Sequence, residues 1–134
     1  MQNTSGGKTA LGLDNNIGAL ICYVGNLVCA IGLIYSIIVL VTDKTNKLPR
    51  FHAMQSILLT VVSAVIGIPA YIIAVGLALS GSSMLAIVAM LLWLVIALIF
   101  LGLFVFMILS AIKAFNGEIY KIPFIGYFAD KWSN

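Results

Sequence analysis

The feature that most constrains this chain is the stretch from Phe51 to Ile112, in which no residue carries a formal charge. A helix needs about 20 apolar residues to cross the hydrocarbon core of a bilayer, so the stretch is long enough for two crossings and a turn. The chain as a whole has 134 residues, of which 63% are hydrophobic and 8% charged. A soluble domain of this size cannot hide so much apolar surface from water. The sequence therefore excludes a soluble enzyme and a disordered chain, and predicts an integral membrane protein.

The apolar stretches predict an all-α integral membrane protein with three transmembrane helices and an amphipathic, aromatic-rich C-terminal tail. Helices are expected because backbone groups in lipid must be hydrogen-bonded internally, and the stretches lack the alternation of barrel strands. The prediction is a single membrane domain. It consists of a polar N-terminus (1–16), a first helix (17–41), a basic loop (42–55), a second helix (56–79), a turn (80–83), a third helix (84–112) and an interfacial tail (113–134).

The distribution of basic residues predicts how the chain is oriented. Every lysine and arginine except Lys8 lies in the first loop or in the tail. Short loops rich in lysine and arginine stay in the cytoplasm. Three spans in the cytoplasmic membrane therefore imply an N-terminus outside the cell and a C-terminus in the cytoplasm. The net charge of +3 is explained by this bias and by attraction to anionic lipids, and we predict no nucleic-acid partner.

Small residues share one face in each of the first two predicted helices. Helices in a bilayer associate through close packing, and small side chains let the two backbones approach. We expect these faces to join the protein's own helices, with a second copy or another subunit as the alternative. The residues are Gly18, Cys22, Gly25, Cys29, Gly32 and Ser36 in the first helix, and Ser56, Thr60, Ser63, Gly67, Ala70, Ala74 and Ala78 in the second.

Arg50, His52 and Gln55 stand at the polar entrance of the second predicted helix. His52 is the only histidine, and no cysteine or carboxylate lies at ligand spacing from it, so we predict no metal site. It could ligate a haem or a chlorophyll-type pigment, but we expect an interfacial hydrogen bond instead and predict no cofactor beyond bound lipids. The sequence contains no nucleophile–base pair, paired carboxylates or phosphate-binding loop, which predicts a protein that is not an enzyme.

The tail mixes aromatic and charged side chains, a composition typical of the lipid headgroup layer. The rings would lie among the headgroups while Lys121, Asp130 and Lys131 stay hydrated. The predicted membrane-interface anchors are Tyr120, Phe124, Tyr127, Phe128 and Trp132.

Three segments together resemble a known family. They lie at 16–23, at 50–56, where the sequence reads Arg50-Phe51-His52-Ala53-Met54-Gln55-Ser56, and at 120–126. Their order is similar to that in small bacterial and archaeal membrane proteins of unknown function. This family is related to the small polytopic subunit of the chloroplast inner-envelope import translocon (the Tic complex). The resemblance covers most of the chain and implies a fold of three or four helices.

These observations lead to three functional hypotheses. The first is a non-catalytic accessory subunit of a larger membrane complex, of respiratory or photosynthetic type, which packs through its small-residue helix faces. The second is a component of translocon-like protein import or insertion machinery. The third is a small carrier or channel, although the spans contain no acidic residue of the kind that ion-coupled transporters use. The expected partners are membrane lipids and other integral membrane subunits, with a homo-oligomer as the alternative.

Overall fold

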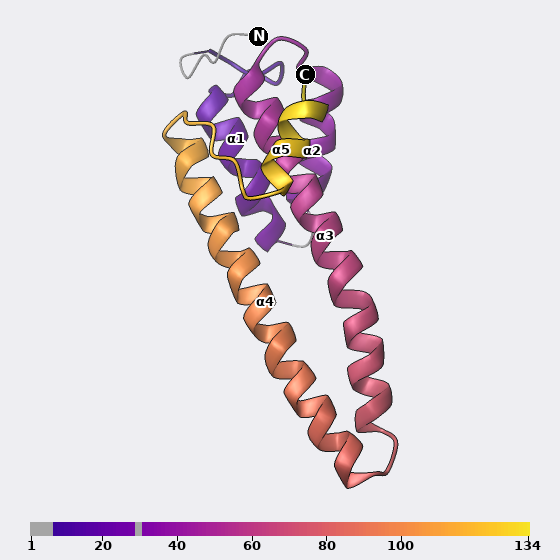
Figure 1. The fold of residues 1–134 in the computed structure, drawn as a ribbon. Coiled ribbons are helices and arrows are strands. Elements are labelled where there is room, and N and C mark those ends of the chain that lie inside the picture. The colour runs from indigo at the N-terminus through magenta and orange to yellow at the C-terminus, as the bar shows by residue number, and fades with distance from the viewer. Residues whose placement is uncertain (1–6, 29–30) are drawn as a thin grey trace. The chain divides into compact units, whose positions relative to one another are not determined.

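The structure, a computed structural model, describes residues 7–28 and 31–134. In these ranges every secondary-structure element is a helix. The all-α prediction is therefore confirmed. The elements are α1 (Asn15–Val24), the short 3-10 helix η1 (Gly25–Leu27), α2 (Ile31–Thr42), α3 (Lys47–Ala78), α4 (Ser83–Phe115) and α5 (Ile125–Trp132), as Figure 1 shows.

The chain forms two compact units. The terminal unit comprises Met1–Thr60 and Phe106–Asn134, and the hairpin unit comprises Val61–Val105. All the lysine, arginine, aspartate and glutamate residues belong to the terminal unit, and the hairpin unit has none.

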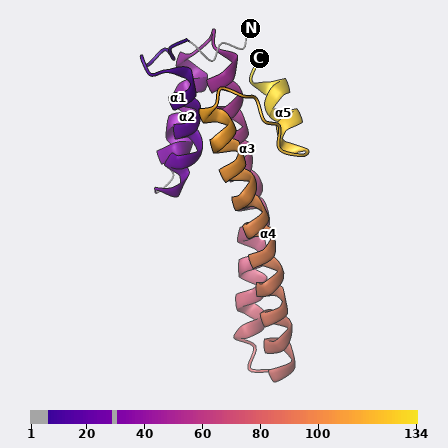
Figure 2. The ribbon, with the colours of Figure 1, turned by 90° about the vertical axis from the view of Figure 1, so that its left-hand side faces the viewer.

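The first apolar stretch differs from the single helix predicted at 17–41. It forms two short antiparallel helices, α1 and α2, which lie side by side in Figures 1 and 2. With 10 and 12 residues and a rise of about 1.5 Å per residue, each helix is too short to cross a hydrocarbon core of about 30 Å. The prediction of three spans is therefore not confirmed by residues 7–28 and 31–134, in which two helices are long and apolar enough to cross a membrane.

Glycines explain why the stretch can fold back on itself. A Cβ atom on Gly25 would lie 2.7 Å from the backbone nitrogen of Gly32, and one on Gly32 would lie 2.5 Å from the backbone nitrogen of Asn26. Only residues without a side chain permit the two backbones to come this close. The two glycines thus permit the close approach of η1 and α2 at one end of the hairpin.

A turn built on Asp43 connects α2 to α3. Its Oδ1 atom accepts hydrogen bonds from the backbone amides of Thr45 (3.3 Å) and Asn46 (3.1 Å), which is the turn chemistry that short polar side chains favour. α3 then begins at Lys47, earlier than the predicted start at 56. Pro49 does not prevent this, because the first turn of a helix has no need of the amide proton that proline lacks.

The N-terminal segment lies beside this turn. The Ala10 amide donates to Asp43 Oδ2 (3.3 Å), and Asn46 Nδ2 donates to the Lys8 carbonyl (3.0 Å). Three spans would put residues 8–10 and the 42–46 turn on opposite sides of a bilayer. These hydrogen bonds are incompatible with that arrangement, so the predicted orientation with the N-terminus outside and the C-terminus inside does not fit the structure.

α3 and α4 are the two helices of the described chain that are long and apolar enough to cross a membrane. They have 32 and 33 residues, and most of their apolar side chains are exposed, unlike those of the core helices of soluble proteins. In the hairpin unit the two helices are packed through Gly67, whose Cβ position faces the Phe100 ring at 2.7 Å. Tyr71 and Trp93 add an edge-to-face contact with centroids 5.8 Å apart.

The tail returns to α3 after α4 ends. Gly117 has a positive φ of 74°, and its amide donates to the Ala114 carbonyl (3.0 Å), which ends α4 close to the predicted helix end at 112. α5 then packs closely on the preceding chain, because a Cβ on Gly126 would lie 2.6 Å from Lys121 Cα. Figure 2 shows α5 apart from α1 and α2 in the terminal unit.

Candidate functional site

The most distinctive site in the terminal unit is a buried group of polar side chains, here called the polar cluster, made of Tyr23, His52, Gln55 and Ser110. All four are fully buried. Two come from the start of α3, one from α1 and one from the end of α4. The cluster therefore joins three helices at a single point.

Gln55 makes the largest number of contacts in the cluster. Its Nε2 atom lies within hydrogen-bond distance of three acceptors, the Tyr23 hydroxyl (3.0 Å), the Ser110 hydroxyl (3.2 Å) and the Tyr120 carbonyl (3.0 Å). Its Oε1 atom accepts from the Ile122 amide (3.2 Å), and this fixes which end of the side-chain amide is the oxygen. One side chain thus binds two helices and the tail.

The hydrogen bonds of the cluster run in one direction. His52 Nε2 lies 3.0 Å from the Glu118 carbonyl, which can only accept, so Nε2 carries the proton. In the neutral ring Nδ1 is then an acceptor, and the Tyr23 hydroxyl, 2.9 Å away, donates to it. Tyr23 in turn accepts from Gln55. In this arrangement both ring nitrogens of the neutral His52 take part in hydrogen bonds within the chain.

A second set of polar contacts joins the end of α1 and the adjoining η1 to α3. Ser56 donates to the Cys22 carbonyl (2.6 Å), and Asn26 Nδ2 donates to the Ser56 hydroxyl (2.8 Å). A weaker contact joins Asn26 to Thr60 (3.4 Å). Interhelical bonds of this kind stabilise helices in apolar surroundings.

Arg50 connects α2, α3 and the C-terminus. Its Nε donates to the Ser133 carbonyl (2.8 Å), and its Nη1 donates to the carbonyls of Leu40 (2.9 Å) and Asp43 (2.6 Å). Each of these acceptors is a backbone atom. A planar guanidinium can serve several carbonyls at once, which a lysine ammonium would do less well.

Asp130 forms the charged part of the tail contacts. Its Oδ2 accepts from Lys121 Nζ (2.8 Å), and its Oδ1 lies 3.3 Å from Lys47 Nζ at the start of α3. The hydrogen bond from Lys121, with a smaller contribution from Lys47, lowers the pKa of the Asp130 carboxyl below its ordinary value.

This lowered pKa predicts an acid-dependent loosening of α5. A carboxyl whose pKa is depressed on folding stabilises the folded state above its ordinary pKa, and that stabilisation is lost as the pH falls through the lowered value. We expect proteolytic cleavage before α5 to accelerate in the acid range below about pH 4. Asp130→Asn should remove this dependence, whereas Lys131→Gln, which leaves both partners of Asp130 in place, should retain it.

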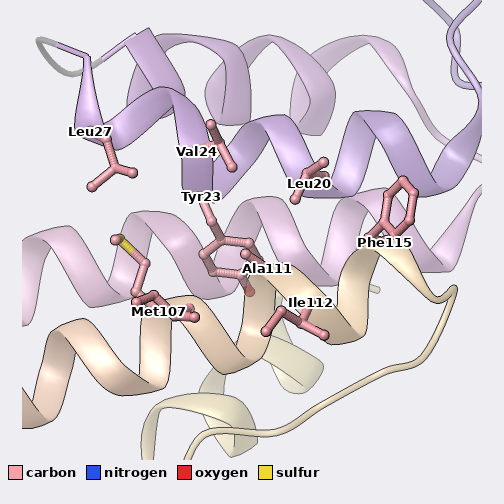
Figure 3. Close-up of a pocket in the computed structure, with 9 residues that line it drawn as sticks. Leu20, Tyr23, Val24, Leu27, Met107, Ala111, Ile112 and Phe115 are labelled. Carbon is pink, nitrogen blue, oxygen red and sulfur yellow. The ribbon is translucent and has the colours of Figure 1, made fainter.

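An apolar groove of about 450 Å³ lies between α1 with η1 on one side and the end of α4 on the other. Figure 3 shows side chains of both segments along it. Its volume is in the range of small-molecule sites, but its lining is hydrocarbon and suits an acyl chain better than a polar ligand. The lining residues are Leu20, Tyr23, Val24, Leu27, Met107, Ile108, Ala111, Ile112 and Phe115.

The small-residue faces of the prediction are largely covered within the chain. In the first stripe, Gly18 faces Thr9 and Tyr35, and Gly25 faces Gly32. Cys22 and Ser36 are buried, and Cys29 lies outside the described residues. In the second stripe, Ser56 and Ala74 are buried, Thr60, Ser63, Gly67 and Ala70 are partly buried, and Ala78 is exposed.

The predicted tail anchors differ in how far their rings are exposed. Tyr120 is partly covered, and its carbonyl contacts Gln55. The other four rings are exposed: Phe124 (88%), Tyr127 (67%), Phe128 (45%) and Trp132 (52%).

Sequence reasoning missed Tyr23 and Ser110 as members of these networks, whereas Asn26, a strongly polar side chain deep in an apolar stretch, predicts an interhelical contact of the kind it makes with Ser56. A tyrosine and a serine in apolar helices have no distinctive spacing, and their roles become visible only when α1 and α4 meet α3. Asn26, next to Gly25 in an apolar stretch, could have indicated the break. Among residues 7–28 and 31–134, no group of three histidine, cysteine or acidic side chains could hold a metal ion.

Comparison with known proteins places the chain in a family. Residues 14–129 match the model of the magnetosome magnetite crystal formation protein family, MamF/MmsF. The chain belongs to the MamF/MmsF family. It is 35% identical to the UPF0132 membrane protein MJ1443 of Methanocaldococcus jannaschii, over 95% of this chain and 96% of that protein. It is 30% identical to MJ1527 of the same organism, over 92% of this chain and 73% of that protein. No solved structure matches.

Membership of MamF/MmsF and the likeness to UPF0132 proteins confirm that this is a small membrane protein. The expected family is thus confirmed at this level, and the relationship to the chloroplast translocon subunit stays a prediction. Neither family name states a reaction.

Proposed function

We propose that this MamF/MmsF protein is a non-catalytic accessory subunit of a larger complex in the cell membrane. The polar side chains of the candidate site support a structural role, because their bonds are directed to the chain itself. Gln55, His52 and Arg50 bond to α1, α2, α4 and the tail, an arrangement that holds a scaffold together.

The observation that carries the proposal is a row of exposed leucines on α4. Leu91, Leu94, Leu98 and Leu101 are 59%, 58%, 61% and 59% exposed. Their spacing of three, four and three residues places them on one helix face, in the repeat by which helices interdigitate in left-handed pairs. The small-residue faces are largely covered within the chain, so this leucine row is the face we assign to a partner helix.

The proposed topology has two crossings rather than three. α3 and α4 cross the bilayer, and the uncharged turn between them lies outside. The terminal unit, which contains all the basic residues, lies on the cytoplasmic side by the positive-inside rule. Both termini are then cytoplasmic, in agreement with the hydrogen bonds from Ala10 to Asp43 and from Arg50 to Ser133.

Site-specific photo-crosslinking in native membranes tests the proposal. A benzophenone amino acid at Leu94 should give one protein adduct of defined mass, identified by mass spectrometry. The same group at Val95, which is 51% exposed but about 100° around the helix, should give much less. Adducts with lipid alone, or equal adducts at both positions, would contradict the proposal. An adduct with a second copy would replace the complex by a homo-oligomer, and adducts with nascent chains would support a translocon-like role instead.

A further inference from the structure

We propose that α5 is an anchor that lies in the headgroup layer of the membrane and binds anionic lipid. The ligand is the lipid surface beside the terminal unit. The inference is independent of the partner face on α4, since it concerns residues of the tail alone.

α5 is held on α3 at both of its ends. Before the helix, the carbonyls of Glu118 and Tyr120 accept from His52 and Gln55. After it, the Ser133 carbonyl accepts from Arg50. Its inner face is made of Gly126 and Ala129, which are buried. The helix therefore has a fixed orientation, and its outer face is a defined surface.

That outer face is aromatic. Tyr127 packs edge-to-face on Phe128 (5.6 Å between centroids), and Phe128 packs on Trp132 (5.4 Å). These three rings stay exposed although they pack on one another, and the Phe124 ring is exposed as well. Phe124 has a positive φ of 63°, which a bulky residue rarely adopts. Exposed aromatic groups of this size mark surfaces that contact a membrane or another molecule.

The charges beside the rings favour a lipid surface. Asp130, the only acidic residue of α5, is neutralised by Lys47 and Lys121. Lys131 in α5 and Lys44 near the start of α3 are exposed. The anionic leaflet attracts such lysines, while tryptophan and tyrosine rings settle at the same depth. Exposed aromatic rings that share their helix with the exposed Lys131, on a segment bonded to α3, match that layer in chemistry.

Quenching of Trp132 tests the proposal. The chain has two tryptophans, so Trp93→Phe leaves Trp132 as the only indole. The full-length variant is reconstituted in vesicles of phosphatidylcholine with phosphatidylglycerol. Lipids brominated near the headgroup end of the chain should quench its emission more than lipids brominated near the methyl end. Acrylamide should quench it less than it quenches a free tryptophan derivative.

Two comparisons make the test specific. Phe128→Ser and Tyr127→Ser keep the Gly126 and Ala129 contacts, and each should cause loss of most of the bromolipid quenching. Each lysine near an anionic surface changes surface affinity about fivefold, so Lys131→Gln should reduce the difference between vesicles with and without phosphatidylglycerol. Full quenching by acrylamide with none by bromolipid would overturn the proposal. So would protection from both quenchers, which would indicate a covering protein.

Discussion

Gly32→Ala should destabilise this protein by about 2 kcal/mol or more, although it adds one methyl group. The added Cβ would lie 2.5 Å from the Asn26 backbone nitrogen and 2.7 Å from the Cys22 carbonyl oxygen. Backbone atoms cannot rotate away as side chains can, so α1 and α2 would have to separate. Overpacking of this kind typically costs 1–3 kcal/mol, about the value expected here. Thermal or detergent-induced unfolding, followed by circular dichroism in micelles, measures the change.

Gly102→Ala is the matched control. It lies in α4, and a Cβ atom at this position would meet nothing within 4 Å. Alanine is favoured over glycine in a helix interior by up to about 1 kcal/mol, so this variant should be as stable as the native protein or more stable. If both substitutions changed the stability alike, the close contact between α1 and α2 would be refuted.

Gln55→Leu should cost about 3 kcal/mol or more, because leucine can neither donate nor accept. The Tyr120 carbonyl, the Ile122 amide and the Ser110 hydroxyl would lose their contact with Gln55, while the Tyr23 hydroxyl would keep its hydrogen bond to His52. Each buried polar group left without a partner costs about 1–3 kcal/mol. The tail should also loosen, which hydrogen exchange at the Ile122 amide measures directly.

Ser110→Ala provides the comparison. The Gln55 side-chain amide has two protons and three acceptors within reach, so it can lose Ser110 and still bind Tyr23 and Tyr120. We expect a loss of less than about 1 kcal/mol and little change in exchange at Ile122. Rapid exchange of the Ile122 amide in Ser110→Ala, together with slow exchange of the same amide in Gln55→Leu, would show that Gln55 does not hold the tail.

The membrane character and the two long helices could be predicted from the sequence because they follow from composition. A charge-free stretch from Phe51 to Ile112 permits few other structures in a chain this apolar. The turn after α3 and the end of α4 were also predictable, since Ser80–Ser83 and Asn116–Gly117 interrupt the apolar pattern by residue type alone.

The hairpin of α1 and α2 could not be predicted, because the spacing of its glycines fits two structures. Gly25 and Gly32 are seven residues apart, which places them on one face of a continuous helix. The same two glycines can face each other across two antiparallel helices. The choice depends on contacts that the local sequence does not contain, such as those of Asn26 with Ser56 and Thr60.

The candidate site was predicted in part. Arg50, His52 and Gln55 were selected as polar residues at a helix entrance, and they form the centre of the buried networks. Their partners were not foreseeable, because most of them are backbone carbonyls at distant positions. A backbone carbonyl has no identity in the sequence, so only the folded chain shows which ones are used.

This choice of acceptors has a consequence for how the protein can diversify. Because α3 holds the C-terminal region by peptide groups at Glu118, Tyr120, Ile122 and Ser133, that region can exchange most of its exterior without losing its attachment. A chimera that carries the surface residues of another relative's terminus should still dock. Such a protein can acquire a new location or a new binding partner while its scaffold stays the same.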